Sequence, residues 1–265
     1  MIGVPENQPI RLPMRFLEKV WGTQDLAPWY PTAGTKIGEV WFEADLPLLV
    51  KFVFTSGRLS VQVHPDDGFA RAHENSRGKT EMWYIMRAEP GARLAIGFRE
   101  SISRERLREA ALSGEIERLL NWLEVQAGDA FFIPAGTVHA IGGGLALCEV
   151  QQQSDVTYRL YDYGRPRELH LDKAIQVSSL EATSPKSLML PIDCEYFHTE
   201  LARTTSKLLY KPESNRFHLV IFVSGLGTIA GKPFREGEAW LVPEGGQPFE
   251  IEPKNPVKFL RTWVP

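Results

Sequence analysis

Cysteine is scarce in this sequence. Its 265 residues include two, Cys148 and Cys194, and two cysteines cannot build the disulfide framework that holds many small secreted proteins together. The first residues, MIGVPENQPIRLPMRF, also lack the charged start and the apolar run of a signal peptide. We therefore expect a cytoplasmic protein whose fold depends on a packed core.

Long hydrophobic runs and a strong net charge are missing as well. No apolar stretch approaches the roughly 20 residues that a helix needs to span a bilayer. The formal net charge of −3 gives the whole molecule no attraction to nucleic acid or to anionic lipid. The sequence therefore predicts no nucleic-acid or membrane partner, while a local basic pocket for a small anion stays open.

What the chain does contain is a series of short strand-like runs. They are broken by turn-forming residues, among them 22 glycines and 19 prolines. Such spacing is typical of an all-β sandwich or small barrel. The clearest runs are LPLLVKFVFT, RLSVQVH, EMWYIM, RLAIGF, DAFFIPA, ALCEVQQQSDVTYRLYDY, FHLVIFVS and EAWLVPE.

One segment, residues 101–123, has helical rather than strand periodicity. Its apolar residues keep the spacing of a helix on both sides of Gly114. Ser103 and Ser113 have side chains suited to N-cap two short helices. The pattern predicts a short helical insertion in an otherwise all-β protein.

A sequence motif occurs twice. GDAFFIPAGTVHAI begins at Gly128 and GEAWLVPEGGQPFEI begins at Gly237. Each copy indicates a glycine turn, a strand and a Pro-Gly turn. His139 of the first copy aligns with Pro248 of the second. The repeat predicts two related β-barrels, and any chemistry of this histidine belongs to the first one alone.

The repeat also predicts how the chain is divided. We expect a catalytic lobe at residues 1–177, which includes the helical insertion near 101–123, and a smaller β lobe at residues 192–265. Residues 178–191, SSLEATSPKSLMLP, have little pattern and are expected to link the two.

Three residues in different strand-like runs have the chemistry of metal ligands. Side chains alternate along a strand, so Gln62 and His64 share one face of SVQVH. Glu81 leads the next run, and His139 follows a Pro-Gly turn. Two imidazoles and one carboxylate form a facial site, to which the Gln62 oxygen could add a fourth ligand. Zinc, iron(II) and manganese all accept such donors.

Most other candidates have a simpler interpretation. Asp66 and Asp67 follow the His64-Pro65 step and are typical turn formers. Cys148 is interpreted as a small buried hydrophobe. Four further histidines are interpreted as surface or structural residues: His73, His170, His198 and His218.

The polar run after Cys148 is unusual for a strand. One unbroken strand would place six residues on one face: Glu149, Gln151, Gln153, Asp155, Thr157 and Arg159. Exposure to solvent explains Gln151 and Gln153, but not a glutamate that follows an apolar run. Polar groups inside a barrel destabilise it unless a ligand uses them. Lys79 and Arg159 could then bind an anionic substrate at the barrel mouth, since arginine makes bidentate contacts to phosphate.

Four motifs together resemble one known family, the type I mannose-6-phosphate isomerases in their short bacterial form. The motifs are VQVHPDD, GKTEMWYI, PAGTVHAIGGG and QQQSDVTYRLYDYGRPRELH. The resemblance is dense from about residue 38 to 171 and loose beyond about residue 191. It implies a cupin β-barrel with a second, metal-free cupin-like lobe. It also implies interconversion of mannose 6-phosphate and fructose 6-phosphate through a cis-enediol.

The resemblance implies a metal site as well. His64, Glu81 and His139 match the family's zinc ligands, and Gln62 matches a fourth ligand of longer members. One Zn²⁺ per chain is therefore expected, with other divalent metals as alternatives.

The same comparison implies how the substrate is handled. Arg159 matches the family's active-site arginine and Lys79 the lysine two residues before the ligating glutamate, so both are expected to act in catalysis and in binding the sugar phosphate. Glu149 and Asp155 match acidic positions. Glu149 is our first choice for the catalytic base, with a metal-bound hydroxide or another acid as alternatives. Asp155 is a candidate for substrate binding.

Two other functions are compatible with these residues. An iron-dependent cupin oxygenase uses a similar facial triad, but it has no need of the cationic pair Lys79 and Arg159. A cupin that binds a sugar phosphate without turnover would keep the metal ligands and the cations alike.

Overall fold

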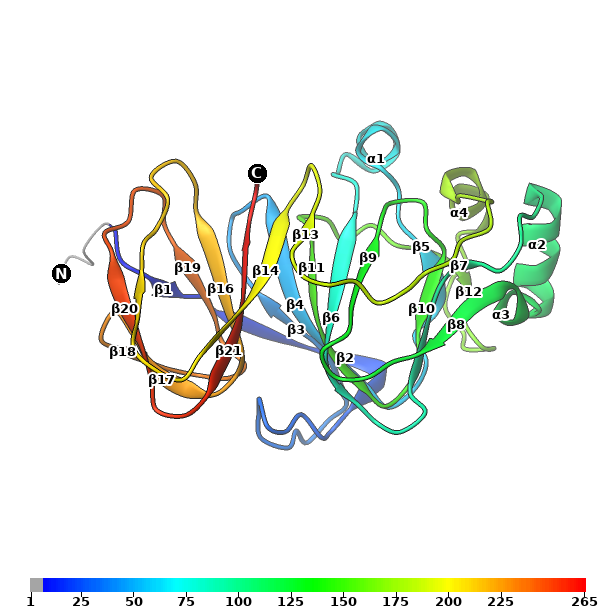
Figure 1. Ribbon diagram of the computed structural model, residues 1–265. Coiled ribbons are helices and arrows are strands. Elements are labelled where there is room, and N and C mark those ends of the chain that lie inside the picture. The colour runs from blue at the N-terminus through cyan, green and yellow to red at the C-terminus, as the bar shows by residue number, and fades with distance from the viewer. Residues whose placement is uncertain (1–6) are drawn as a thin grey trace.

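The protein is built almost entirely from β-sheet. The computed structural model describes residues 7–265, in which the strands form four antiparallel sheets and helices are few. Figure 1 shows the sheets as two β-barrels that lie side by side. The predictions of an all-β fold with two related barrels and a short helical insertion are confirmed.

The first barrel combines a six-stranded and a five-stranded sheet. In sheet order, the six strands are β2 (Met14–Thr23), β3 (Ile37–Phe42), β4 (Leu48–Thr55), β11 (Leu145–Gln152), β6 (Glu81–Ala88) and β9 (Ala130–Ile133). The five strands are β12 (Tyr158–Tyr161), β5 (Val61–Val63), β10 (His139–Ile141), β7 (Arg93–Phe98) and β8 (Leu120–Glu124).

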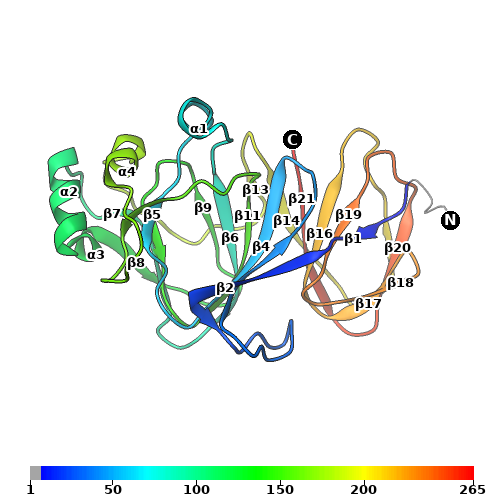
Figure 2. The ribbon, with the colours of Figure 1, turned by 180° about the vertical axis from the view of Figure 1, so that it is seen from behind.

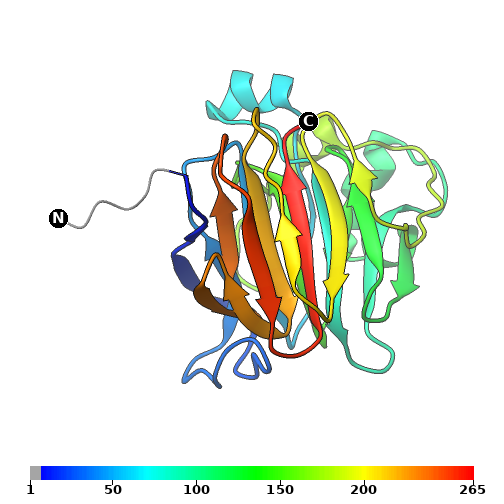
Figure 3. The ribbon, with the colours of Figure 1, turned by 60° about the vertical axis from the view of Figure 1, so that its left-hand side comes forward.

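The second barrel is formed mostly by the C-terminal part of the chain, as seen from behind in Figure 2 and from the side in Figure 3. Its first sheet has the order β1 (Ile10–Arg11), β19 (Ala239–Val242), β16 (His218–Ser224), β21 (Val257–Trp263), β14 (His198–Thr204) and β13 (Ile192–Asp193). Its second sheet has the order β15 (Leu208–Tyr210), β20 (Phe249–Pro253), β17 (Leu226–Ile229) and β18 (Lys232–Arg235).

The long polar run after Cys148 is not one strand. β11 ends at Gln152 and β12 begins at Tyr158, so residues 153–157 form a connection. The prediction that alternation continues unbroken to Arg159 is therefore wrong. Gln151 is fully buried whereas Gln153 is exposed, so solvent exposure explains the second glutamine but not the first.

The helical insertion lies at the outer end of the first barrel (Figure 1). α2 (Arg104–Ser113) begins after Ser103, whose hydroxyl accepts a hydrogen bond from the Arg106 amide as predicted. Ser113 is the last residue of α2 instead of an N-cap, because the chain turns at Gly114 with φ of +81°. α3 (Ile116–Leu119) is shorter than predicted, since the residues from Leu120 onward form β8.

Two helices were not predicted from the sequence. α1 (Asp67–Glu74) occupies the segment interpreted as turn-rich, and Asp66 is its N-cap. The Asp66 carboxylate accepts a hydrogen bond from the Phe69 amide, so its role is local and structural. α4 (Leu171–Val177) packs beside α2 and β12.

The repeated motif forms the same structure in both barrels. Gly128 and Gly237 have φ of +101° and +89°, which glycine adopts without strain. The Gly128 amide donates to the Ile85 carbonyl and the Gly237 amide to the Phe222 carbonyl, each at 2.8 Å. β9 and β19 therefore enter their sheets by equivalent turns.

Packed side chains fill both barrels and the space between them. Along β11, Ala146, Cys148 and Val150 pack between the barrels, whereas Leu147 faces the interior of the first barrel together with Ile85 of β6. Both faces of this strand are therefore covered. Cys148 is a free, buried thiol, as interpreted from the sequence. None of the described helices is long and apolar enough to cross a membrane.

Candidate metal centre and active site

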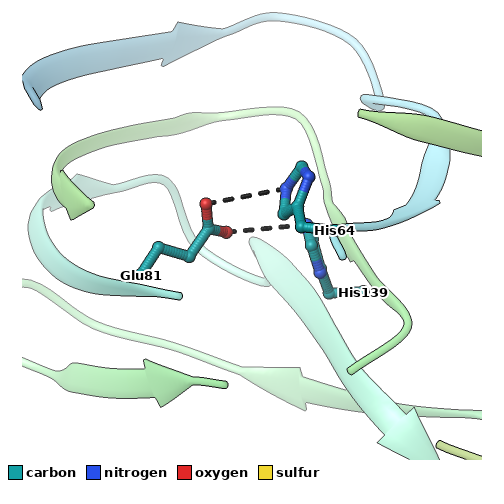
Figure 4. Close-up of side chains that lie close together, drawn as sticks. All are labelled: His64, Glu81 and His139. Carbon is teal, nitrogen blue, oxygen red and sulfur yellow. Dashed lines mark ion pairs between the residues drawn. The ribbon is translucent and has the colours of Figure 1, made fainter. Parts of the chain in front are cut away.

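Three strands of the first barrel bring the predicted metal ligands together. His64 directly follows β5, Glu81 is the first residue of β6, and His139 is the first residue of β10. β5 and β10 are neighbours, with Gln62 opposite His139. Residues separated by up to 75 positions in the chain therefore meet because their strands share one barrel (64 to 139). Figure 4 shows the three side chains pointing toward one another.

The geometry of this cluster suits a single ion. One oxygen of Glu81 lies 3.6 Å from Nε2 of His64 and the other lies 3.5 Å from Nε2 of His139. All candidate ligand atoms lie within 4.8 Å of one another. The three side chains are buried, and none is more than 2% exposed.

Backbone carbonyl groups orient both imidazoles. Nδ1 of His64 lies 2.9 Å from the Val156 carbonyl oxygen, and Nδ1 of His139 lies 2.9 Å from that of Thr137. A carbonyl oxygen can only accept, so each Nδ1 carries the proton and each Nε2 keeps a lone pair able to accept a hydrogen bond or bind a metal. Metal-binding histidines are commonly held in this way.

The electrostatics of the cluster favour a cation. Burial, together with the nearby Glu149 carboxylate, raises the pKa of Glu81 to about 8. Both Glu81 oxygens are buried and accept no hydrogen bond within the described residues. Burial also lowers the pKa of His139 to about 4 and lowers that of His64, so both rings are neutral at pH 7. With a pKa of about 8, Glu81 holds a proton at pH 7 when no cation is bound. A divalent metal would replace that proton and be held by the carboxylate and the two neutral imidazoles.

Gln62, the expected fourth ligand, lies beside the cluster. Its side-chain amide is 3.2 Å from Nε2 of His139 and is also bonded to Ser60. Rotation of the amide by about 180° exchanges its nitrogen and oxygen, so the oxygen can reach the same position.

A buried charge network lies beside the cluster. Lys79 Nζ is 3.2 Å from Nε2 of His64, 3.4 Å from a Glu81 oxygen and 4.0 Å from Glu149. Burial alone would lower the pKa of Lys79, but the two carboxylates outweigh it and raise the pKa. Lys79 therefore contacts the group of candidate ligands His64, Glu81 and His139, which we call the metal cluster.

Lys51 is a site residue that the sequence reasoning missed. Its ammonium group lies 3.3 Å from Glu149 and 4.5 Å from the centre of the Trp41 ring. Trp83 donates a hydrogen bond to the same carboxylate at 3.1 Å. A lysine in the otherwise apolar run LPLLVKFVFT was the signal that could have found it, because a buried lysine needs a partner.

A cavity of about 260 Å³ opens beside this network. Gln62, Lys79 and Glu149 line it, and so do Asp155 and Arg159. The structure thus brings the predicted substrate and catalytic residues to one cavity. The sequence reasoning did not select several other lining residues: Lys19, Trp21, Glu39, Lys51 and Arg167.

Asp155 and Arg159 line the cavity without belonging to the charge network, and they differ in their exposure to solvent. Asp155 is exposed and lies in the connection between β11 and β12. Arg159 is half-buried in β12, where its guanidinium donates to the Glu168 carbonyl at 2.7 Å. Its Nε has no hydrogen-bond partner in the part of the chain that the structure describes.

Comparison with known proteins agrees with this site. Mannose-6-phosphate isomerase ManA of Bacillus subtilis strain 168 is 33% identical over an alignment of 308 residues, which covers 93% of this chain and 96% of the relative. Mannose-6-phosphate isomerase of Streptococcus mutans is 45% identical over 140 residues, or 51% of this chain and 44% of the relative. No protein-family model matches the chain.

A solved structure matches along nearly the whole chain. The crystal structure of mannose 6-phosphate isomerase from Bacillus subtilis superposes with a TM-score of 0.87 at 25% sequence identity, covering 97% of this chain and 99% of the other. Sequence and fold agree over the full length of both molecules. The chain belongs to the type I mannose-6-phosphate isomerase family.

Proposed function

We propose that this protein is an aldose–ketose isomerase that interconverts mannose 6-phosphate and fructose 6-phosphate through a cis-enediol. One observation carries the proposal: a buried two-histidine, one-glutamate cluster lies beside a cavity lined by lysine, arginine and a buried glutamate. Membership of the isomerase family supports the same activity. Nothing in the site favours an oxygenase or a purely binding cupin.

The metal is proposed to be Zn²⁺, one per chain. His64, Glu81 and His139 would hold it, with Gln62 as a fourth ligand, and this donor set suits zinc. When bound, such an ion polarises the oxygens at C1 and C2 of the sugar and stabilises negative charge that develops there.

Glu149 is proposed as the base that moves the proton between C1 and C2. Burial raises the pKa of Glu149, but Lys79 and Lys51 more than offset this, so the net pKa is lowered. The carboxylate is therefore ionised at neutral pH and able to accept a proton. Lys79, 4.0 Å from Glu149, would add positive potential where the enediolate forms.

Arg159 and Asp155 are proposed to bind the substrate. The Arg159 guanidinium lines the cavity, where it is able to contact a phosphate. Asp155 lines the same cavity and could accept hydrogen bonds from sugar hydroxyls. In this arrangement Arg159 binds the phosphate and Lys79 acts at the reacting carbons.

We also propose the division into a catalytic lobe at residues 1–177, a linker at 178–191 and a smaller lobe at 192–265. The metal cluster and its cavity lie within the first range. β1 departs from this division, because it pairs with β19 of the second barrel.

The proposal is tested by a coupled assay for fructose 6-phosphate with metal analysis of the same preparation. His139→Ala should lose both the metal and the activity, because one of three protein ligands is gone. His73→Ala is the matched control, since His73 lies in α1 outside the cluster and should keep both.

Circular dichroism checks that the His139 variant is folded. Full isomerase activity in a metal-stripped sample would overturn the proposal. Oxygen uptake during turnover would instead indicate an oxygenase, and sugar-phosphate binding without any turnover would indicate a binding protein.

A further inference from the structure

A second cavity lies in the first barrel next to the helical insertion, and it shares no lining residue with the cavity at the metal cluster. Its volume is about 330 Å³, and it adjoins another recess of about 750 Å³. The two recesses share four lining residues: Arg93, Glu117, Arg118 and Trp122. We call this pair of recesses the insertion pocket.

The insertion pocket is strongly cationic. Arg58, Arg93 and Arg118 line its first part, and Arg99 lines the second part together with Arg93 and Arg118. Its one acidic lining residue, Glu117, is neutralised by an ion pair with Arg58.

Three of these arginines carry uncompensated charge. In the region from residue 7 to the C-terminus, the guanidinium groups of Arg93, Arg99 and Arg118 form neither an ion pair nor a hydrogen bond. All three side chains are exposed to solvent, so water weakens but does not abolish the repulsion between their charges. An anionic ligand bound between them would remove that repulsion.

Trp122 gives the pocket a flat apolar wall. Its indole Nε1 donates to the Glu117 carbonyl at 2.9 Å, so the orientation of the ring is fixed by the protein itself. Gly142 and Gly143 also line the pocket, and each lies too close to neighbouring backbone to accept a side chain. A Cβ on Gly142 would lie 2.3 Å from the Arg93 carbonyl oxygen, and one on Gly143 would lie 2.7 Å from that of Ser56.

The helical insertion supplies part of the lining of the insertion pocket. In the second barrel, the equivalent strands β17 and β18 are joined by residues 230–231 alone, whereas β7 and β8 are joined by residues 99–119. That long connection supplies Arg99, Glu117 and Arg118 to the pocket. It contributes no residue to the cavity at the metal cluster.

We propose that the insertion pocket binds a nucleoside phosphate. Arg93, Arg99 and Arg118 would contact the phosphate oxygens, because guanidinium groups match phosphate geometry. The ring of Trp122 would stack on the planar base, as aromatic side chains do in nucleotide and nucleic-acid sites. A ligand that has both a phosphate and a flat ring uses both features of the pocket.

Isothermal calorimetry on the full chain tests this proposal with ADP and, separately, with inorganic pyrophosphate. ADP should bind roughly tenfold more tightly than pyrophosphate, because only ADP has a base to stack. R93Q/R118Q should weaken both ligands by roughly tenfold or more, since charge-assisted bonds are lost. W122L should reduce ADP to the affinity of pyrophosphate, and W122F should restore part of the difference.

The controls separate this site from others. R203Q removes another exposed arginine, on β14 of the second barrel, and should change nothing. R159Q alters the cavity at the metal cluster and should leave ADP binding intact. The proposal is overturned if ADP does not bind to the wild-type chain, or if R159Q abolishes binding while R93Q/R118Q preserves it.

Discussion

Lys51 places a full positive charge inside the first barrel, where it is 4% exposed. Burial and the neighbouring Lys79 lower its pKa, while Glu149 at 3.3 Å holds the proton in place. The same contact keeps the Glu149 carboxylate ionised. Removal of Glu149 would leave Lys51 buried without this ion pair, whereas removal of Lys51 would leave Glu149 with Lys79 at 4.0 Å and the Trp83 indole at 3.1 Å.

Lys51→Met should lower the free energy of unfolding by about 3 kcal/mol, since it removes one partner of a buried ion pair. The double variant Lys51→Met/Glu149→Leu should recover most of that loss, because no charge is then left unpaired. Urea unfolding of the three proteins measures both effects. Equal stability of the wild-type chain and of the single variant would contradict the assigned pairing.

The role of a residue could be predicted where its type departs from the pattern of the surrounding sequence. His64, Glu81 and His139 stand out because each interrupts or ends an apolar run, and the structure gathers all three. Lys51 sits in such a run too, but one lysine has no partner within its own strand, and Glu149 lies 98 positions away (51 to 149). Only the pairing of β4 with β11 places them opposite each other.

At the scale of elements, a titratable side chain forms a hydrogen bond between two strands of the second barrel. Nδ1 of His218 in β16 lies 2.7 Å from the hydroxyl of Tyr210 in β15. Burial, with a smaller contribution from Arg261, lowers the pKa of His218 to about 4, although Glu213 lies 3.8 Å from its Nε2. The ring is therefore neutral in the folded protein at all but acidic pH.

This histidine should make stability depend on pH. In the unfolded chain it takes up a proton below its ordinary pKa of 6.5, whereas in the folded protein it does so only near pH 4. The unfolded state therefore binds more protons between these values, and stability falls as the pH falls through that window. Between pH 7.5 and pH 5, the free energy of unfolding of the His218→Gln variant should fall by about 1 kcal/mol less than that of the wild-type chain. This figure allows for solvent screening.

Urea unfolding at the two pH values measures this difference. Comparison with the variant isolates His218, because the buried histidines of the metal cluster are present in both proteins. The same pH dependence in both proteins would show that folding does not shift the pKa of His218.

Helices and turns could be predicted where residues close together in the chain determine where they begin or end. Ser103 caps α2, and the two glycine turns recur because each needs a positive φ. α1 also had a local signal in Asp66 and Ala70, but the segment was interpreted as a turn. The end of the helical insertion was not local, since residues from Leu120 onward become β8 by pairing with β7.

At the scale of the whole molecule, the two barrels share a hydrophobic core. Phe52 of β4 and Ile221 of β16 belong to one buried cluster that spans the space between the barrels. Trp29 and Tyr30 strengthen this contact from the loop after β2. The Trp29 indole donates to the Val223 carbonyl at 2.8 Å, and the Tyr30 hydroxyl donates to the Gly237 carbonyl at 2.6 Å.

Trp29→Ala should therefore destabilise both barrels together. Loss of a buried indole from the shared core should lower the free energy of unfolding by about 4 kcal/mol. Tyr30→Phe is a milder comparison that removes one hydroxyl and should have an effect of about 1 kcal/mol. Calorimetry should give one transition for the wild-type chain, and two well-separated transitions would contradict a shared core.

The sequence by itself determined the β-sheet class, the repeated turn, the capped helix and the set of side chains able to bind a metal. These features depend on neighbours in the chain, on strand alternation and on the chemistry of single residues. The tertiary structure decided which polar residues are paired, that Lys79 lies at the metal cluster, and that β11 is buried on both faces. Those outcomes depend on strand order and on the packing of one barrel against the other, which bring together residues that no local pattern connects.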